Sequence, residues 1–405
     1  MNGLNRVVIT GSGIYSALGF TPGELFDNLA ANRSAVVRGG EDENFLPTAP
    51  APRDPERFRV LPRTLRRAMA PSACFTAMAG LAAMRDSGLT QDDLTALHAG
   101  CAVGSTMGSV STLREGYALV LSGQSDRLSP MHFFKSASHT TAFNLARTLG
   151  INGAIYSPCS ACASGLQSLG IGAALIAAGQ ETIMFCGGAD ETGSEVSGSF
   201  ALMYAHAPAG DDPTDSSRPF SADRKGLVCG EGAAVFCMEE YEHAVRRGAK
   251  IYGEIIGYSS NSGGNGLSQS DAPAIARCMA DTCASAGIDP ASVDYLSAHA
   301  TSTLQGDAAE AAAIREVFGV NVPVSSLKGH LGHTLGASGP LEMAAVFEMA
   351  RHGVLIPTRS LNAIDPACAG IDHVTALREK RIRIFFKNSF AFGGINASLI
   401  CKLNV

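Results

Sequence analysis

The sequence predicts an α/β fold in which helices cover β-sheets, and two observations support this prediction. Short apolar runs alternate with amphipathic, helix-like stretches along the chain of 405 residues, as in proteins whose sheets are covered on both faces. Hydrophobic residues make up 46% of the chain and charged residues 17%, so a large core can form. Trp is absent and Gly contributes 45 residues, which indicates an aliphatic core with many close backbone approaches. The length corresponds to about two to three domains or to one large duplicated unit.

In the first half, strands are expected at short apolar runs bounded by turn residues, and helices where apolar residues recur at helical spacing. A strand at 6–10, followed by Gly11-Ser12-Gly13, precedes a helix at 21–30, for which Thr21 is the cap and Pro22 the first helical residue. The polar, proline-rich segment 40–62 is expected to be irregular and at the surface. The other expected elements are helices at 65–87, 136–149 and 166–179 and strands at 101–104, 154–157, 181–186 and 232–238.

The second half repeats this alternation. Strands are expected at 251–258, 293–297, 322–326, 382–389 and 397–403, and helices at 272–286, 306–318 and 337–352. The pattern places the best internal boundary near Ala249, directly after a basic helix end. The sequence therefore predicts two units, 1–249 and 250–405.

Charge and composition exclude several classes of function. The net charge of −6 gives no overall attraction to nucleic acid. No stretch reaches the ~18 apolar residues that a membrane-spanning helix needs, so no membrane association is expected. The eleven cysteines are dispersed and no charged-then-apolar signal segment is visible. This pattern predicts free thiols and a cytoplasmic location.

Cys162 is the first candidate catalytic residue, because it lies between the end of an expected strand and the start of a helix. The unpaired N–H groups of a first helical turn carry partial positive charge, which favours a thiolate. The small neighbours Ala161, Ala163, Ser164 and Gly165 allow a sharp turn and close approach of a substrate. The alternative is a buried, inert cysteine, the usual role in a chain with eleven of them.

Cys159 and Cys162 also form a C-x-x-C pair, for which a redox function and zinc binding are the alternatives. Pro158 precedes the pair and no thioredoxin-like context follows, which disfavours a redox function. No second C-x-x-C exists in the sequence, which disfavours zinc binding. His330 and His333 could form a metal pair, but their spacing in a glycine-rich turn without a nearby carboxylate disfavours it. The sequence therefore predicts no metal site.

Two histidines follow expected strands. His299 ends one strand, before a helix opened by Gly306-Asp307, and His333 follows the next strand in a glycine-rich segment. Enzymes of the α/β class place site residues just beyond the carboxyl ends of strands. Each histidine alone is better explained as a hydrogen-bonded loop residue. Both together with a strand-end cysteine indicate a nucleophilic site.

Glycine pairs mark two further segments. The segment 388–396 contains paired glycines that expose backbone N–H groups and permit movement, and the simpler alternative is a β-turn between the last two strands. The segment 11–13 lacks the third glycine of a dinucleotide-binding motif, so nucleotide binding is not supported.

Together these elements resemble the β-ketoacyl-acyl-carrier-protein synthases, the elongating condensing enzymes of type II fatty acid synthesis. The resemblance covers essentially the whole chain. The segment 160–165 is similar to the family's nucleophile turn and selects Cys162 over Cys159. The segment 298–303 resembles the first histidine motif, and Lys328 with His333 the second. The segment 388–394 resembles the family's C-terminal gating loop. Further matches to the family lie at 218–220, 223–224 and 230–233.

The resemblance implies the thiolase fold, with two duplicated βαβαβαββ halves in a five-layer α-β-α-β-α sandwich. Residues 1–249 would carry the nucleophilic cysteine, and residues 250–405 the two histidines and the gating loop. The catalytic residues implied are Cys162, His299, His333 and Lys328, with the N–H groups of Cys162 and Phe392 as the oxyanion hole. The substrate-binding residues implied are Thr301, Thr303, Phe390, Phe392 and Met107, and the supporting residues Glu342, Asp307 and Asn388.

The implied reaction is a decarboxylative Claisen condensation of malonyl-carrier protein with an acyl chain held as a thioester on Cys162. Neutral His299 and His333 would donate hydrogen bonds to the enolate. No metal or diffusible cofactor is implied. Acyl carrier protein is the expected partner and would dock on a basic patch of Arg63, Arg66 and Arg67, whose alternative is a solvated helix face. A homodimer is expected, and a heterodimer with a ketosynthase-like subunit is the alternative.

Three positions depart from the family pattern. Ala300 and Ala391 stand where glycines are usual, and His330 is an additional histidine. These departures leave open a specialised polyketide or polyene pathway. A thiolase is disfavoured because 390–394 holds no second cysteine, and a non-catalytic chain-length-factor-like subunit because Cys162 is present.

Overall fold

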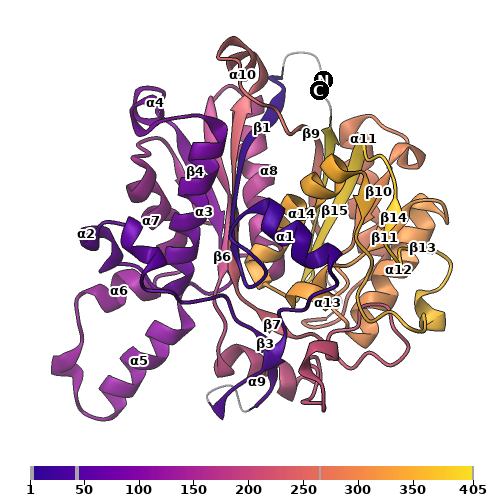
Figure 1. Ribbon diagram of the computed structural model, residues 1–405, viewed down its shortest axis with the longest axis horizontal. Coiled ribbons are helices and arrows are strands. Elements are labelled where there is room, and N and C mark those ends of the chain that lie inside the picture. The colour runs from indigo at the N-terminus through magenta and orange to yellow at the C-terminus, as the bar shows by residue number, and fades with distance from the viewer. Residues whose placement is uncertain (1–3, 42–44, 264–265, 404–405) are drawn as a thin grey trace.

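The first half of the sheet is built around β1, which lies at the centre of the molecule (Figure 1). The computed structural model of the chain describes residues 4–41, 45–263 and 266–403. From the outer edge inward, the strands are β5 (Ile155–Tyr156), β4 (Gly100–Gly104), β6 (Ile183–Asp190), β8 (Gly232–Glu240) and β1 (Val7–Ser16). The β5–β4 and β4–β6 pairs are parallel, and the β6–β8 and β8–β1 pairs are antiparallel.

The second half repeats this order. From the outer edge inward, the strands are β11 (Pro323–Ser325), β10 (Tyr295–Ser297), β15 (Ile384–Ala391), β16 (Ile395–Leu403) and β9 (Gly253–Ser262), with β13 (Asp372–His373) outside β11. The parallel and antiparallel pairs follow the same sequence as in the first half. When the strands of each half are numbered along the chain, leaving out β13, they lie in the order third, second, fourth, fifth, first from the outer edge inward. A short antiparallel pairing of β1 with β9 joins the halves, so the duplication of the thiolase-like fold is present.

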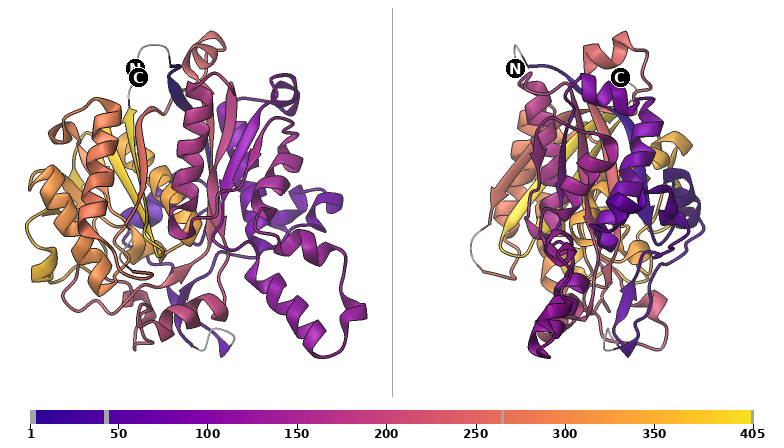
Figure 2. Two further views of the ribbon diagram at one scale, coloured as in Figure 1. Left: turned by 180° about the vertical axis from the view of Figure 1, so that it is seen from behind. Right: turned by 90° about the vertical axis from the view of Figure 1, so that its left-hand side faces the viewer.

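Helices form the other layers (Figures 1 and 2). The first half is covered on its outer face by α3 (Pro71–Ser87) and α7 (Thr140–Leu149), and the second by α11 (Ala272–Ala286) and α12 (Leu304–Phe318). Between the two sheet halves lie α8 (Ser164–Ala177) and α14 (Ser338–His352). This is the expected five-layer arrangement.

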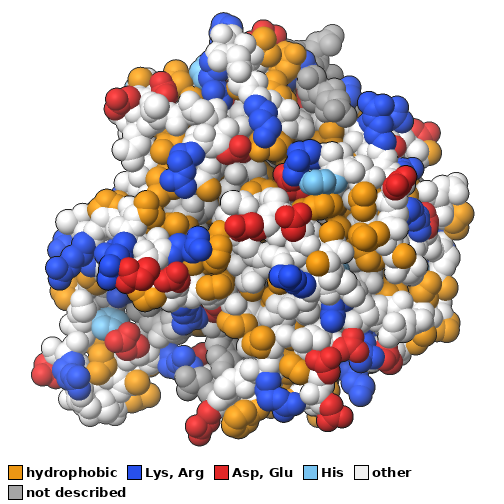
Figure 3. All heavy atoms as spheres, viewed as in Figure 1, with side chains coloured by type: hydrophobic (Ala, Val, Ile, Leu, Met, Phe, Trp, Pro, Cys, Tyr) orange, Lys and Arg blue, Asp and Glu red, His pale blue; other side chains and the backbone are white. Residues whose placement is uncertain are grey.

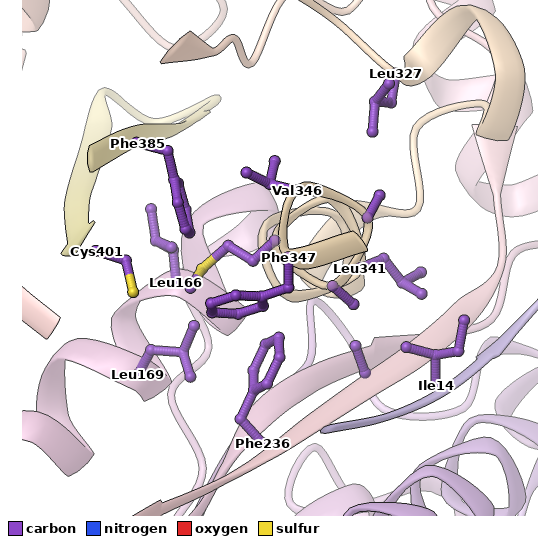
Figure 4. Packing of buried hydrophobic residues seen from close by; sticks show 14 of the residues in the cluster. Ile14, Leu166, Leu169, Phe236, Leu327, Leu341, Val346, Phe347, Phe385 and Cys401 are labelled. Atoms are coloured by element: carbon purple, nitrogen blue, oxygen red, sulfur yellow. The ribbon is translucent and has the colours of Figure 1, made fainter. Parts of the chain in front are cut away.

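The centre of the core lies around α14, which is viewed end-on in Figure 4. The ring centroid of Phe347 on α14 lies 5.8 Å from that of Phe236 on β8 and 5.5 Å from that of Phe385 on β15. One side chain therefore contacts both halves of the sheet. Burying a side chain of this size contributes about 1.5–3 kcal/mol, so the contacts of Phe347 help to hold the two halves of the sheet together.

The first expected strand is longer than predicted, because Gly11 and Gly13 lie inside β1 and not in a turn. A Cβ atom at Gly11 would lie 2.3 Å from the carbonyl oxygen of Ala83 on α3, and one at Gly13 would lie 2.0 Å from that of Ala79. These glycines allow α3 to pack directly on the strand, so their function is close packing.

Two long predicted helices differ from the structure, one by division and one by a later start. The predicted helix 65–87 becomes α2 (Arg63–Arg66) and α3, since Pro71 can occupy only the first turn of a helix. The predicted helix 136–149 corresponds to α7 alone, and α6 (Met131–Ser136) ends where its expected start lies. The helices α5 (Val110–Leu121) and α9 (Ser194–Leu202) were not expected, because only two residues of each are buried and the apolar periodicity is weak.

The segment 40–62 is less irregular than predicted. Within it, β3 (Pro47–Ala49) is buried and pairs with β2 (Val37–Arg38) and β7 (Cys229–Gly230), while 42–44 lie outside the described residues. The predicted helix 21–30 is confirmed as α1 (Pro22–Ala30), with the Thr21 side chain accepting a hydrogen bond from the Glu24 N–H. The remaining named elements are α4 (Gln91–Ala96), α10 (Tyr241–Arg246), α13 (Lys328–Leu331), β12 (Val354–Leu355) and β14 (Arg378–Glu379). Among the described residues, no helix combines the length and apolar character needed to cross a bilayer.

Candidate active site

Cys162 is buried in a 3-10 turn, Ala161–Ala163, that leads directly into α8. Ala161 has a φ of 47°, a left-handed conformation that is uncommon for a residue with a Cβ atom. Such strain is retained where the surrounding structure demands it, and it clusters at functional sites. The turn aims the thiol into the protein at the amino end of α8.

His333 lies directly beside this thiol. Its Nε2 atom is 2.9 Å from Sγ of Cys162, and its Nδ1 atom is 2.9 Å from the Ser338 hydroxyl. His299, just beyond β10, faces the same point, with its ring centroid 5.2 Å from that of His333. The sulfur of Cys162 and one ring nitrogen each of His299 and His333 all lie within 4.8 Å of one another. The structure therefore brings the three predicted catalytic side chains together.

Close backbone packing makes this meeting possible. A Cβ atom at Gly165 would lie 2.2 Å from the carbonyl oxygen of Gly336, and one at Gly188 would lie 2.1 Å from the same oxygen. The carboxylate of Asp190 accepts hydrogen bonds from the Gly336 N–H (2.7 Å) and the Ser105 hydroxyl (2.7 Å). The end of β6 thus connects the cysteine turn to the histidine loop. Asp190 was not predicted from the sequence, although it lies at the end of β6.

The three side chains open into a small cavity. Its volume is about 30 Å³, room for about one water molecule. Its lining includes predicted site residues together with Ala300 and Ala391, the two positions where the family usually has glycine. The predicted site residues are Cys162, His299, Thr301, Thr303, His333, Phe390 and Phe392. A surface groove that includes Met203, Tyr204 and Gln305 shares Thr303 and Phe392 with this cavity, so the two lie end to end.

Aromatic rings line the cavity. The ring of Phe392 lies 5.7 Å from that of Phe200 on α9, in an edge-on contact. The ring of Phe390 lies 5.9 Å from that of His299. The loop that carries Phe392 joins β15 to β16, and its Gly393 and Gly394 have φ values of 86° and 79°. The β-turn alternative for 388–396 is therefore correct for the backbone, and this turn also lines the cavity.

A buried network of charges lies behind the cavity. Nζ of Lys328 is 2.7 Å from Oε1 of Glu342, and Lys387 forms an ion pair with the other oxygen of the same carboxylate. Burial lowers the pKa of Lys387 to about 8. Two ammonium groups share one carboxylate, so this network gives the site positive potential. Lys387 was not predicted from the sequence, where it appears as an ordinary residue in a strand.

His299 is held from behind by Glu310 on α12. The Glu310 carboxylate accepts hydrogen bonds from the backbone N–H groups of His299 (2.8 Å) and Ala300 (2.6 Å). It also accepts one from Nδ2 of Asn388 (2.9 Å), a predicted supporting residue. Glu310 was missed because nothing in its sequence context separates it from other glutamates on helices.

Burial determines the protonation of the reactive groups. It raises the pKa of the Cys162 thiol to about 12, against the lowering effect of Lys328. It lowers the pKa values of His299 and His333 well below the ordinary value, and Lys328 lowers them further. At neutral pH the resting pair is a thiol beside a neutral imidazole. Burial therefore opposes the thiolate expected from the helix start, because desolvation penalises the charged form.

Other predicted residues lie further from the thiol. Asp307 is buried and accepts hydrogen bonds from the N–H groups of Phe220 (2.8 Å) and Ser302 (3.0 Å), and burial raises its pKa to about 7. Thr301 and Thr303 have their hydroxyl oxygens 3.2 Å apart. Met107 is 45% exposed and does not line the catalytic cavity.

The predicted basic patch lies on α2. Arg63 and Arg67 are exposed, and Arg66 is half-buried with its Nε donating to the Leu61 carbonyl. Figure 3 shows Lys and Arg side chains gathered over α2, at the left of the view.

Two residues considered from the sequence lie away from the cavity. Cys159 is exposed and its Sγ contacts the carbonyl oxygen of Thr106 at 3.2 Å. His330 is buried, with its ring nitrogens 3.0 Å from the Arg33 carbonyl and 3.2 Å from that of Pro357. His330 therefore connects separate segments, and it does not form a metal pair with His333.

Comparison with known proteins identifies the class to which this fold and site belong. The family model described as beta-ketoacyl synthase, N-terminal domain, matches residues 4–244, and the corresponding C-terminal domain model matches residues 252–362. The chain belongs to the β-ketoacyl synthase family.

Individual relatives are similar over their full lengths. The chain is 33% identical to 3-oxoacyl-[acyl-carrier-protein] synthase 1 of Haemophilus influenzae, over 98% of this chain and 99% of the relative. A crystal structure of a beta-ketoacyl synthase from Burkholderia phymatum is 38% identical, with a TM-score of 0.95 over 99% of this chain and 100% of the other. The ishigamide ketosynthase/chain length factor is 30% identical, with a TM-score of 0.93 over the same shares.

Proposed function

We propose that the chain is a 3-oxoacyl-[acyl-carrier-protein] synthase, which joins a malonyl unit to an acyl chain by decarboxylative Claisen condensation. The observation that carries this proposal is the 2.9 Å contact between Sγ of Cys162 and Nε2 of His333, with His299 facing the same cavity. The name of the Haemophilus relative supports a carrier-bound substrate. No metal or diffusible cofactor takes part in the proposed reaction, because the acyl groups arrive as thioesters.

The first step is acylation of Cys162. His333 Nε2 accepts the thiol proton as Sγ attacks the carbonyl carbon of the incoming acyl thioester. The new bond joins Sγ to the acyl carbon, and the bond to the pantetheine sulfur breaks. The proton on His333 then passes to the leaving pantetheine thiolate, so His333 is neutral again.

Decarboxylation of the malonyl group is the second step. The bond between its carboxylate and α-carbon breaks, carbon dioxide leaves, and the electron pair forms an enolate at the thioester. The neutral imidazoles of His299 and His333 donate N–H groups to the enolate oxygen. Their lowered pKa values suit this task, since each ring remains a neutral hydrogen-bond donor at pH 7.

The third step forms the carbon–carbon bond. The enolate carbon attacks the acyl carbonyl on Cys162, and the backbone N–H groups of Cys162 and Phe392 hold the oxyanion. The intermediate collapses with departure of the Cys162 thiolate, which takes up a proton from solvent, the one proton that decarboxylative condensation consumes overall. Lys328 supplies positive potential behind these charges. Because the cavity has room for about one water molecule, we expect Phe392 to move when an acyl chain enters.

Ser338 lets His333 act in both half-reactions. Acylation needs a free lone pair on Nε2, whereas enolate stabilisation needs an N–H there. A hydroxyl can accept from Nδ1–H in the first case and donate to Nδ1 in the second, and Ser338 lies 2.9 Å from this atom. Ser338 is therefore proposed as a positioning residue that selects the tautomer.

The carrier-bound substrate would reach the cavity through the groove that contains Tyr204. Thr301 and Thr303 line the inner end and would hold the pantetheine arm.

The acidic carrier protein would dock on Arg63, Arg66 and Arg67. Reversing these charges should raise KM for carrier-bound substrate and affect a free pantetheine thioester much less, with Arg246→Glu on the distant α10 as control. Equal effects on both substrates would contradict docking there.

Met107 is proposed to limit the acyl chain at the far end of its path. Asp190 connects the Met107 loop to the histidine loop, through Ser105 and Gly336. Met107→Phe should shorten the longest chain accepted, and Met107→Ala should lengthen it. An unchanged chain-length profile in both folded variants would remove Met107 from the path.

One experiment tests the function as a whole. Purified protein is supplied with an acyl-carrier protein and malonyl-carrier protein, and the 3-oxoacyl product and carbon dioxide are measured. Cys162→Gln should lose condensation yet retain decarboxylation, because the histidine pair remains. Loss of both activities in a folded variant would contradict the division of roles.

A second candidate is a ketosynthase that works only with a ketosynthase-like partner subunit. The similarity to the ishigamide ketosynthase/chain length factor favours this possibility. A homodimer remains the first proposal, and activity of the chain purified alone, with its mass measured by light scattering, separates the two. A non-catalytic role is disfavoured by the Cys162–His333 contact.

A further inference from the structure

We infer that Cys162, His299 and His333 form a reversible binding site for a thiophilic divalent cation, with Zn²⁺ as the best fit. Among the described residues these three form the group of cysteine, histidine and carboxylate side chains whose donor atoms converge closely enough to hold an ion. The assignment rests on geometry alone. Only its consequence for catalysis depends on the proposed function.

The distances suit a tetrahedral ion. With typical Zn–S and Zn–N bond lengths, two ligand atoms of one zinc ion lie about 3.4–3.6 Å apart. The three donor atoms here lie within 4.8 Å of one another, and the Cys162–His333 pair is 2.9 Å apart. Shifts of about 1 Å therefore bring all three to bonding geometry. The cavity, with room for about one water molecule, supplies the open fourth position.

The two histidines are able to act as ligands. Ser338 contacts Nδ1 of His333, so this atom can carry the proton and leave the Nε2 lone pair directed at the ion. Nδ1 of His299 is buried and has no hydrogen-bond partner among the described residues. Nδ1 of His299 therefore has no hydrogen bond within the described residues that would compete with a metal, and Glu310 holds the backbone of His299 by accepting from its N–H group.

The ligand types and the surrounding charge determine the class of ion. A thiolate with two imidazoles suits zinc and disfavours the oxygen-seeking Mg²⁺. The buried ammonium groups of Lys328 and Lys387, both paired with Glu342, oppose any cation held by charge alone. Binding must therefore come from bonds to sulfur and nitrogen, with release of the thiol proton as Cys–SH becomes Cys–S–Zn.

The consequence is an inactive state of the enzyme. A metal on Sγ removes the nucleophile, and the same ion occupies the two rings that would stabilise the enolate. The bound cation thus blocks acylation and decarboxylation together. A chelator that removes the ion should reverse this inhibition.

Titration of the full-length protein with Co²⁺, and then with competing Zn²⁺, tests this inference. Co²⁺ bound by a thiolate gives a charge-transfer absorption that does not depend on enzyme activity. One equivalent should produce the band, Zn²⁺ should abolish it, and Mg²⁺ should have no effect. Cys162→Ala should lose the band and weaken Zn²⁺ binding by at least about a hundredfold, as removal of a direct ligand demands. Cys159→Ala, the matched control, should bind as the original protein does.

A band that persists in Cys162→Ala, or that disappears in Cys159→Ala, would overturn the assignment, as would the absence of Co²⁺ binding. If Cys162→Ala fails to fold, the alkylation rate of Cys162 in the original protein is measured with and without Zn²⁺. Bound Zn²⁺ should slow this alkylation, and an unchanged rate would refute the site. Acylation of the metal-free protein is measured separately. Metal binding without acylation would leave this site standing and refute the proposed function.

Discussion

Sγ of Cys162 and Nε2 of His333 lie 2.9 Å apart, although 171 positions separate the two residues in the chain. Each half of the duplicated fold contributes one of them. The contact depends on the close approach of Gly165 and Gly188 to the Gly336 carbonyl. The proposed reaction depends on this pair and on the contacts that position it.

Ser338→Ala should slow both acylation and decarboxylation, by about ten- to hundredfold, since His333 loses the hydroxyl that selects its tautomer. Ser338→Thr keeps the hydroxyl and should restore much of the rate. Ser389→Ala is the control, because its buried hydroxyl has no hydrogen-bond partner in the described part of the chain. Pre-steady-state kinetics of each half-reaction give the measurement. Equal rates in Ser338→Ala and the original protein would contradict the tautomer role.

Glu310→Gln should reduce decarboxylation by about ten- to hundredfold while leaving acylation of Cys162 nearly unchanged. An amide cannot accept all of the hydrogen bonds that His299, Ala300 and Asn388 now donate to the carboxylate, and small displacements of a catalytic ring are costly. Glu316→Gln, at an exposed position of the same helix, should behave as the original protein. The idea fails if acylation and decarboxylation fall together.

The reaction of Cys162 with iodoacetamide should accelerate about tenfold per pH unit from pH 7 to 9 without a plateau. The pKa of this thiol is raised to about 12 by burial, so the thiolate fraction still rises throughout this range. Lys328 lowers that pKa, so Lys328→Ala should react more slowly, whereas the exposed Lys402→Ala should not. A plateau with a midpoint below pH 7 would show a resting thiolate instead.

Gly165→Ala should lower the free energy of unfolding by about 1–3 kcal/mol and reduce acylation, because the added methyl group would lie 2.2 Å from the Gly336 carbonyl oxygen. Gly198→Ala in α9 is a matched control. A Cβ atom there meets no atom of the described residues within 4 Å, and Ala should stabilise this helix by about 0.5–1 kcal/mol. Chemical denaturation of both variants provides the comparison. Equal stability of the two would show that the loops do not require this close approach.

Local pattern was enough to predict most of the architecture. The helix at 272–286 was predicted with the bounds of α11, and the strand-end positions of Cys162, His299 and His333 were evident because apolar runs stop before them. The resemblance to a family then supplied the roles of these residues and the duplicated arrangement of strands.

Long-range contacts explain what the sequence did not reveal. Glu310 and Lys387 lie in an ordinary helix and an ordinary strand, and their importance comes from partners such as His299 and Glu342 that are distant in the chain. Burial of Cys162 opposes the helix-terminus effect, and desolvation depends on tertiary packing. The same reason explains Gly11 in β1, whose contact with α3 cannot be inferred from local spacing.

The central claim is that Cys162 is the acylated nucleophile, and peptide mass spectrometry after incubation with an acyl-carrier protein tests it most directly. The account predicts a single acyl adduct on Cys162, its loss in Cys162→Ala, and its retention in Cys159→Ala, whose thiol is exposed and outside the cavity. An adduct mapped to Cys159, or acylation that persists in a folded Cys162→Ala variant, would contradict the account.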